Sequence, residues 1–214
     1  MKKLCVSILL VSALSSGCAR TVTSIGQVGS QITVQVTFKE DIQSENRLFI
    51  LFGARNQAPV VPFIPFELVP PGEAVTDTQI NYFTDFYSSW TDYALVQGQV
   101  AQLIRGPFTS GGTPEALQLS EFTRPTNSTF SLTYALNRMS FGATTPEFLY
   151  IDIVSVGRDN KVADNLSFNL PAGTLSTLQM RTDQGTSLSY SDLDAAGAVI
   201  NGSLDIQNYT ISVQ

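Results

Sequence analysis

The sequence predicts an all-β protein built as an antiparallel β-sandwich, with one short aromatic amphipathic helix near residues 77–91. Charged residues make up 14% of the chain, against about 25% in a typical soluble domain. Long exposed helices usually carry Glu and Lys on their wet face, so this composition favours strands and turns. Stretches in which apolar and polar residues alternate also recur along the chain, as expected of half-buried strands.

The first residues have the pattern of a secretory signal peptide, expected at 1–17. A lysine pair at 2–3 precedes an apolar run over 4–14. This run is shorter than the ~20 residues that a helix needs to cross a bilayer. A positively charged start followed by a short apolar region is typical of secreted proteins. The run ends in the motif Leu-Ser-Ser-Gly-Cys at 14–18.

This motif resembles the lipobox of bacterial lipoproteins, although Ser15 stands where that family most often has leucine. In the family a diacylglyceryl group is attached to the cysteine sulfur, and a peptidase then cuts before the cysteine. The resemblance implies that Cys18 is the lipidation site and that 18–30 form a lipidated N-terminus and tether. The alternative is an ordinary cleavage site near Ser16 or Ala19.

The same resemblance implies where the protein is located. Ala19 follows the cysteine directly and differs from the aspartate that is often associated with inner-membrane retention in this family. The resemblance therefore implies the cell envelope, and the outer membrane rather than the inner one. The expected partner is the membrane itself, held through acyl chains that contribute about 0.8 kcal/mol per buried methylene.

Five predicted strands lie in the first two thirds of the chain. Residues 31–38 alternate strictly, which indicates a half-buried strand, and 46–54 are almost continuously apolar, which indicates a more central one. Residues 93–104 are typical of two short strands around Gly98, because glycine takes a positive φ without steric cost. In 128–136 alternate apolar residues are expected to face the core, and these are Phe130, Leu132, Tyr134 and Leu136.

The clearest predicted hairpin spans 147–168. Two β-rich runs flank a turn that contains Gly157, Asp159 and Asn160. This segment resembles the last strand pair of an immunoglobulin-like or fibronectin-type sandwich. The resemblance implies that fold for a single domain at 31–214.

Two further strands are expected near the C-terminal end, over 177–182 and 203–214. In the second strand the alternation slips at Gln207 or Asn208, which predicts a β-bulge. A subdivision of the domain near 170–175, at a connector that contains proline, is left open.

The helix is predicted over 76–93 as three or four turns, with Thr76 and Gln79 as a capping box. At 100° per residue its aromatic side chains fall within an arc of about 140°. Burial of this stripe in the core is favoured, because aromatic rings bury large apolar areas and an exposed patch needs a special reason. The alternative is a surface that binds a glycan, with Tyr87 and Trp90 as the candidate ligand-binding residues.

Two loops separate these elements. Residues 58–71 are rich in proline, which removes backbone donors, so they cannot form a central strand. A packed connector is favoured over a partner-binding segment, because the aliphatic and phenylalanine side chains favour burial. Residues 106–114, rich in glycine, are predicted to form a flexible exposed loop.

Residues suited to catalysis are scarce. The chain has no histidine, which is the commonest general base and transition-metal ligand. Asp85 and Asp92 would share one face of the predicted helix, but a solvated polar face explains them better than a catalytic pair. Asp192 and Asp194 lie among hydroxyl groups without the full pattern of a calcium loop. We therefore predict no catalytic residue, no metal and no cofactor.

The net charge of the chain indicates which class of partner is unsuitable. A formal net charge of −6 disfavours a nucleic acid, which needs a basic footprint. We expect an envelope-anchored lipoprotein that is not an enzyme and has a binding or structural role, with a protein or glycan partner. The alternative is a carboxylate-dependent glycoside hydrolase or a carbohydrate-binding module that acts on envelope or extracellular polysaccharide.

Overall fold

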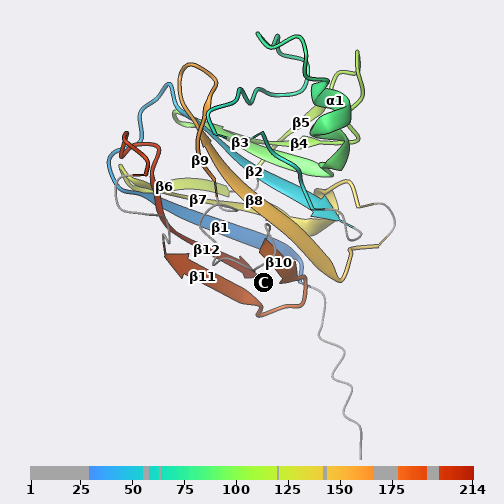
Figure 1. Ribbon diagram of the computed structural model, residues 1–214. Coiled ribbons are helices and arrows are strands. Elements are labelled where there is room, and N and C mark those ends of the chain that lie inside the picture. Colours follow the sequence, from blue (N-terminus) through green and yellow to red (C-terminus); the bar gives the residue numbers. More distant parts are fainter. Residues whose placement is uncertain are drawn as a thin grey trace, which may run out of the picture.

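The computed structural model describes residues 29–54, 58–62, 64–119, 121–141, 144–165, 178–191 and 198–214. These residues form an all-β sandwich of two antiparallel sheets, as predicted (Figure 1). The expected signal peptide, Cys18 and the connector near 170–175 lie outside the described residues. Within the described ranges, no helix is both long enough and apolar enough to span a membrane.

The smaller sheet has five strands in the order β11-β12-β1-β7-β6. Their bounds are Ser187–Ser191 for β11, Ile206–Val213 for β12, Gln31–Phe38 for β1, Thr129–Ala135 for β7 and Glu121–Thr126 for β6. The strands predicted at 31–38, 128–136 and 203–214 are confirmed here. The sequence analysis missed β6 and β11, which are the two edge strands and carry many polar residues.

The larger sheet has seven strands in the order β10-β8-β2-β3-β4-β5, with β9 also paired to β8. Their bounds are Leu178–Arg181 for β10, Phe148–Val156 for β8, Arg47–Ala54 for β2, Asp92–Gln97 for β3, Val100–Arg105 for β4, Glu115–Gln118 for β5 and Val162–Asn165 for β9. As predicted, β2 is central, and the hairpin of β8 and β9 is present. Strands β10, β11 and β12 follow this hairpin in the chain, so it is not the last strand pair that the resemblance implied.

Two local backbone features were predicted correctly. The turn between β3 and β4 contains Gly98 with φ of 59°. In the pairing of β1 with β12, Thr37 lies opposite Asn208 and Phe38 lies opposite Ile206, so Gln207 is the extra residue of a bulge.

The inner core lies between the two sheets. Alternate residues of the paired strands fill it, because successive side chains of a strand point to opposite faces of the sheet. Its fully buried side chains include Ile32, Val34, Val36, Leu132, Ile50, Phe52 and Ile151.

A second cluster of buried side chains covers the opposite face of the larger sheet, and we call it the outer layer. On β2, Phe49 and Leu51 point into the outer layer, whereas Ile50 and Phe52 point into the inner core. The other buried members are Leu68, Tyr82, Tyr87, Trp90, Tyr93, Ile104, Phe108, Val154, Val156 and Val162. The larger sheet is therefore buried on both faces, which explains why β2 is almost continuously apolar.

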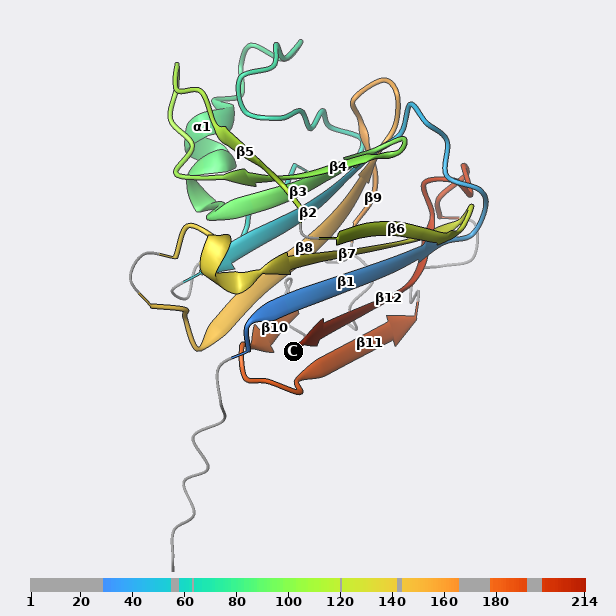
Figure 2. The same cartoon turned by 180° about the vertical axis from the view of Figure 1, so that it is seen from behind.

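The predicted helix is confirmed in position but is much shorter than three or four turns. Helix α1 spans only Tyr82–Asp85, and a 3-10 turn, η1, spans Tyr87–Ser89. Trp90 already has extended backbone angles, and Asp92 begins β3. In Figures 1 and 2, α1 lies at the upper end of the molecule, near β3, β4 and β5.

The helix also begins later than predicted, because local hydrogen bonds compete with it. The side chain of Asp77 accepts a hydrogen bond from the Gln79 amide at 2.9 Å, which forms a turn instead of a first helical turn. Thr76 is not the N-cap, since its amide and hydroxyl both donate to Glu67 Oε2 at 2.8 Å. The N-cap is Asn81.

Both connectors contribute buried side chains to the outer layer. In 58–71, Leu68 and Val69 are fully buried, which supports a packed connector at that end of the segment. Its other part is more exposed than expected, with exposed fractions of 47% for Val60, 41% for Ile64 and 47% for Phe66. In 106–114, Phe108 is buried beside Tyr93, so this loop is anchored to the sheet rather than fully exposed.

Candidate functional site

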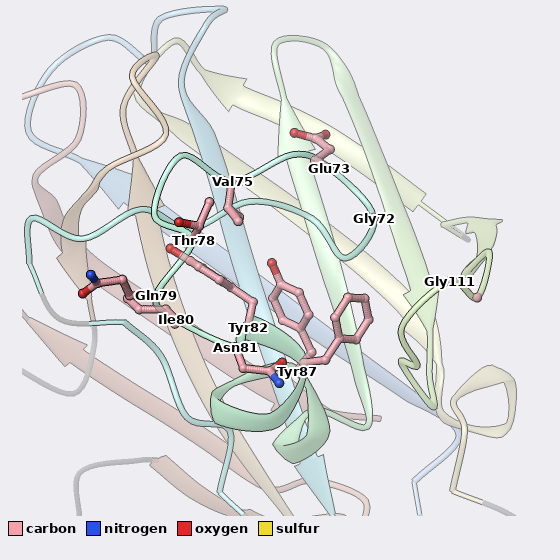
Figure 3. A pocket seen from close by; sticks show the side chains of 12 residues that line it. Gly72, Glu73, Val75, Thr78, Gln79, Ile80, Asn81, Tyr82, Tyr87 and Gly111 are labelled. Carbon is pink, nitrogen blue, oxygen red and sulfur yellow. The ribbon is translucent and has the colours of Figure 1, made fainter.

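A pocket of about 690 Å³ opens above the outer layer (Figure 3). The segment 72–87 forms most of its wall, and the turn at 111–112 forms the rest. Figure 3 shows Tyr82 and Tyr87 close together in the pocket, with the loop of Gly72 and Glu73 beside them. Segments that are distant in the sequence therefore form one concave surface.

The aromatic floor of the pocket is held in place by backbone contacts. The hydroxyl of Tyr82 donates to the Glu67 carbonyl at 3.0 Å, and the hydroxyl of Tyr87 donates to the Val69 carbonyl at 2.8 Å. Phe83 packs edge-on against Tyr87, with ring centroids 5.2 Å apart. Burial raises the pKa of the Tyr87 hydroxyl well above its ordinary value, so this group remains a protonated donor at neutral pH.

The polar wall of the pocket consists of uncharged side chains. Thr78, Gln79 and Asn81 line it, and all three are exposed. The Asn81 side-chain oxygen accepts a hydrogen bond from the Thr84 amide at 3.3 Å. Among the residues that the structure describes, nothing bonds to the side chains of Thr78 and Gln79. These two side chains can therefore hydrogen-bond a ligand without first losing a protein partner.

The pocket has one charged lining side chain among the described residues, and it is already paired. Glu73 Oε2 lies 2.8 Å from the Arg47 guanidinium. The same guanidinium nitrogen donates to Asn160 Oδ1 at 3.2 Å. Glu73 is 44% exposed at its side chain, so this pair is partly solvated and contributes little to stability. The pocket therefore presents hydrogen-bonding groups and apolar carbon, with its one carboxylate balanced by a cation.

Tyr87 and Trp90 are both buried, with exposed fractions of 2% and 3%. Trp90 Nε1 donates to the Val60 carbonyl at 2.8 Å, and the Trp90 ring lies 4.9 Å from that of Tyr87. Tyr82 and Tyr93 are buried as well, so the favoured interpretation of the aromatic stripe as core is confirmed for these four residues, whereas Phe83 and Phe86 are half-buried. Trp90 does not line the pocket, whereas Tyr87 does. A ligand-binding role for either residue stays a prediction.

The two carboxylates expected on one helix face are separated, so that expectation is wrong. Asp85 is exposed on α1 and its Oδ2 accepts from the Asn81 amide at 3.2 Å. Asp92 is fully buried at the start of β3. The helix that would have aligned them ends before Asp92, and neither residue lines the pocket.

Two other candidate sites lie outside the described residues. Cys18, the expected lipidation site, belongs to the undescribed N-terminal part, and Asp192 and Asp194 belong to the undescribed range 192–197. In the remainder of the chain that is described, no three or more Asp, Glu, His or Cys side chains come together as a metal site.

Sequence reasoning missed the polar wall of the pocket. It assigned Thr78, Gln79 and Asn81 to a continuous helix, in which they would have been ordinary solvated positions. The available signal was Asp77 two residues before Gln79, a spacing at which an aspartate side chain often caps a turn. The turn at 111–112 lines the same pocket, but nothing in the local sequence indicates that it lies near segment 72–87.

Comparison of the chain with protein-family models, with curated proteins and with solved structures found no match.

Proposed function

We propose that this protein is an envelope-anchored lipoprotein that is not an enzyme and that binds a partner through the pocket above its outer layer. The observation that carries the proposal is the position of the chain ends relative to the pocket. The amide of Ser30 donates to the Gln214 carbonyl at 2.6 Å, so the chain enters β1 beside the end of β12. In both views this end lies at the bottom of the molecule, and α1 lies at the top (Figures 1 and 2).

This arrangement suits a protein held at its N-terminal end. A tether over 19–30 spans at most about 40 Å when fully extended. Attachment at Cys18 would direct the lower end of the sandwich toward the membrane and the pocket away from it. A lipid on one cysteine also needs no spanning helix, because acyl burial supplies the anchoring free energy.

The side chains in the pocket support binding rather than hydrolysis. A glycosidase needs two carboxyl groups about 5 to 9.5 Å apart on either side of the bond that it cleaves. Glu73 is the one carboxylate among the lining residues, and Arg47 pairs with it. The alternative of a carboxylate-dependent hydrolase gains no support from Asp85 and Asp92, which lie in different environments.

Metabolic labelling tests the anchor. Cells that express the full-length protein with a palmitate analogue should incorporate label into the wild type and into Cys5→Ser, and should lose it in Cys18→Ala. The protein should also move from the membrane fraction to the aqueous fraction in Cys18→Ala. Equal labelling of the wild type and Cys18→Ala would contradict the proposal.

A further inference from the structure

We infer that the pocket above the outer layer binds a neutral oligosaccharide. This inference deepens the proposed binding role and rests on it, but it is independent of lipid attachment at Cys18. It follows from three properties of the pocket: the kind of groups that line it, their charge, and the openness of its rim.

The lining groups match the two kinds of surface that a sugar ring presents. A pyranose ring has C–H faces that pack on aromatic and aliphatic carbon, and hydroxyl groups at its edges that both donate and accept hydrogen bonds. Phe83, Val75 and Ile80 are half-buried, pack against the outer layer and also line the pocket, so they present apolar carbon there. Gln79 and Thr78 supply amide and hydroxyl groups beside that carbon.

The charge around the pocket selects against ionised ligands. An anionic ligand, such as a phosphate or a uronic acid, needs a cation directed into the site, and no lysine or arginine lines this pocket in the described part of the chain. The guanidinium of Arg47, which contacts the lining residue Glu73, is paired with that carboxylate. A cationic ligand needs an unpaired carboxylate, which the pairing of Glu73 removes. A neutral ligand needs neither an unpaired cation nor an unpaired carboxylate, so this pocket favours a neutral ligand.

The rim of the pocket leaves room for a chain of sugars. Gly72 and Gly111 lie on it, with φ of 100° and 78°, and no atom beyond the adjacent residues lies within 4 Å of where a Cβ would stand at either residue. Figure 3 shows the two glycines on separate loops at the edge of the pocket. An opening without side chains at two points suits an extended oligomer better than a single enclosed molecule.

The pocket is also held in shape before a ligand arrives. Tyr82 and Tyr87 are fixed by hydrogen bonds to the backbone of the connector, at Glu67 and Val69. Side chains that are already ordered lose little conformational entropy on binding, which favours measurable affinity from a small contact area.

The test is binding of the full-length protein, extracted in detergent, to an array of defined oligosaccharides. The probes are neutral oligomers of glucose, galactose, mannose and N-acetylglucosamine, together with oligomers of galacturonic acid and sulfated oligomers. We expect retention of at least one neutral series and no retention of the anionic ones. Preference for the anionic oligomers, or no binding of any neutral series, would overturn the inference.

Two variants locate the binding. Thr78→Trp should fill the pocket and weaken retention at least tenfold, and its matched control Thr144→Trp, at an exposed threonine outside the pocket, should bind as the wild type. Gln79→Ala should weaken binding several-fold without a change in folding, with Gln102→Ala on β4 as its control. Wild-type binding by Thr78→Trp and Gln79→Ala would show that the sugar binds elsewhere.

The outcomes for the two proposals are separable. If neutral oligosaccharides do not bind but crosslinking in cells captures a protein at Thr78, the binding role of the pocket stands and the glycan inference fails. If labelling at Cys18 fails but oligosaccharides bind, the anchor fails and the glycan inference stands.

Discussion

At the scale of single residues, Asp92 combines complete burial with a carboxyl group whose pKa is shifted. Its carboxylate is fully buried and accepts hydrogen bonds from the Ser140 amide at 2.9 Å and from the Gly106 amide at 3.3 Å. Burial raises the pKa of Asp92 to about 6, although these hydrogen bonds and the charge of Arg105 partly oppose the increase. Burial raises the pKa of the nearby Tyr134 hydroxyl well above its ordinary value, and the negative charge of Asp92 adds to the increase.

A pH dependence of stability follows from this buried carboxylate. The folded protein binds the Asp92 proton more tightly than the unfolded chain, whose ordinary pKa is 3.8. Its contribution to the free energy of unfolding is therefore present below about pH 4 and is lost as the pH rises through about 6. The expected loss is up to about 3 kcal/mol. Urea denaturation at pH values between 4 and 7.5 measures it.

The variant Asp92→Asn isolates this contribution. Other titrating groups affect the variant and the wild type alike. As the pH rises from 4 to 7.5, the free energy of unfolding of the wild type should therefore fall relative to that of Asp92→Asn. Parallel pH profiles for the two proteins would show that Asp92 does not titrate in this range.

At the scale of elements, the hairpin of β3 and β4 depends on the backbone of one glycine. Gly98 has φ of 59°, and a Cβ built there would lie 3.6 Å from the Ser44 carbonyl oxygen, which is an ordinary contact. The cost of a larger side chain therefore comes from the left-handed backbone and not from a clash.

Gly98→Ala should consequently lower the free energy of unfolding by about 1 kcal/mol. Asparagine tolerates this backbone conformation better than alanine, so Gly98→Asn should lose less. Urea denaturation of both variants at one pH gives the comparison. A loss in Gly98→Asn equal to or larger than that in Gly98→Ala would mean that contacts of the side chain, and not backbone angles, control the turn.

The strands were predictable from sequence where one face is buried, whereas the helix was predictable in position but not in length. In β1 and β7 alternate residues enter the inner core, so the period of two appears directly in the sequence. The aromatic segment brings Tyr82, Tyr87 and Tyr93 to the same outer layer from a helix, a 3-10 turn and a strand in turn. Tertiary packing places these side chains on a common face. Their spacing in the sequence fits a helical period of 3.6, but a continuous helix is not what brings them together.

The candidate site was less predictable than the fold. Of the two candidate ligand-binding residues, Tyr87 lines the pocket and Trp90 does not. Trp90 donates to the Val60 carbonyl and packs against the ring of Tyr87. The exposed polar residues that line the pocket have no distinctive spacing, because loops at 72–81 and 111–112 meet only in three dimensions. The sequence alone therefore could not predict this pocket, and the structure was needed to identify it.

At the scale of the whole molecule, the inner core and the outer layer share the same strands. Alternate residues of β2 enter the two clusters, and β3 and β8 also contribute to both. Loss of either cluster would therefore remove support from one face of the same sheet. This coupling predicts that both clusters unfold together.

The single tryptophan of the chain allows a direct test, since Trp90 lies in the outer layer. Its fluorescence reports the outer layer, whereas far-ultraviolet circular dichroism reports the strands of both sheets. We expect the same urea midpoint by both methods. A fluorescence transition at a lower urea concentration would show that the outer layer separates first and that the inner core is stable without it.

The free edge at β6 affects how copies of this protein behave when they are crowded. This strand carries Glu121, Arg124 and Pro125, and its pairing with β7 shifts register between Thr123 and Thr126. Charge, proline and irregular pairing each hinder the addition of a strand from a neighbouring molecule. Copies at high concentration could thus approach one another at this edge without joining into a continuous sheet.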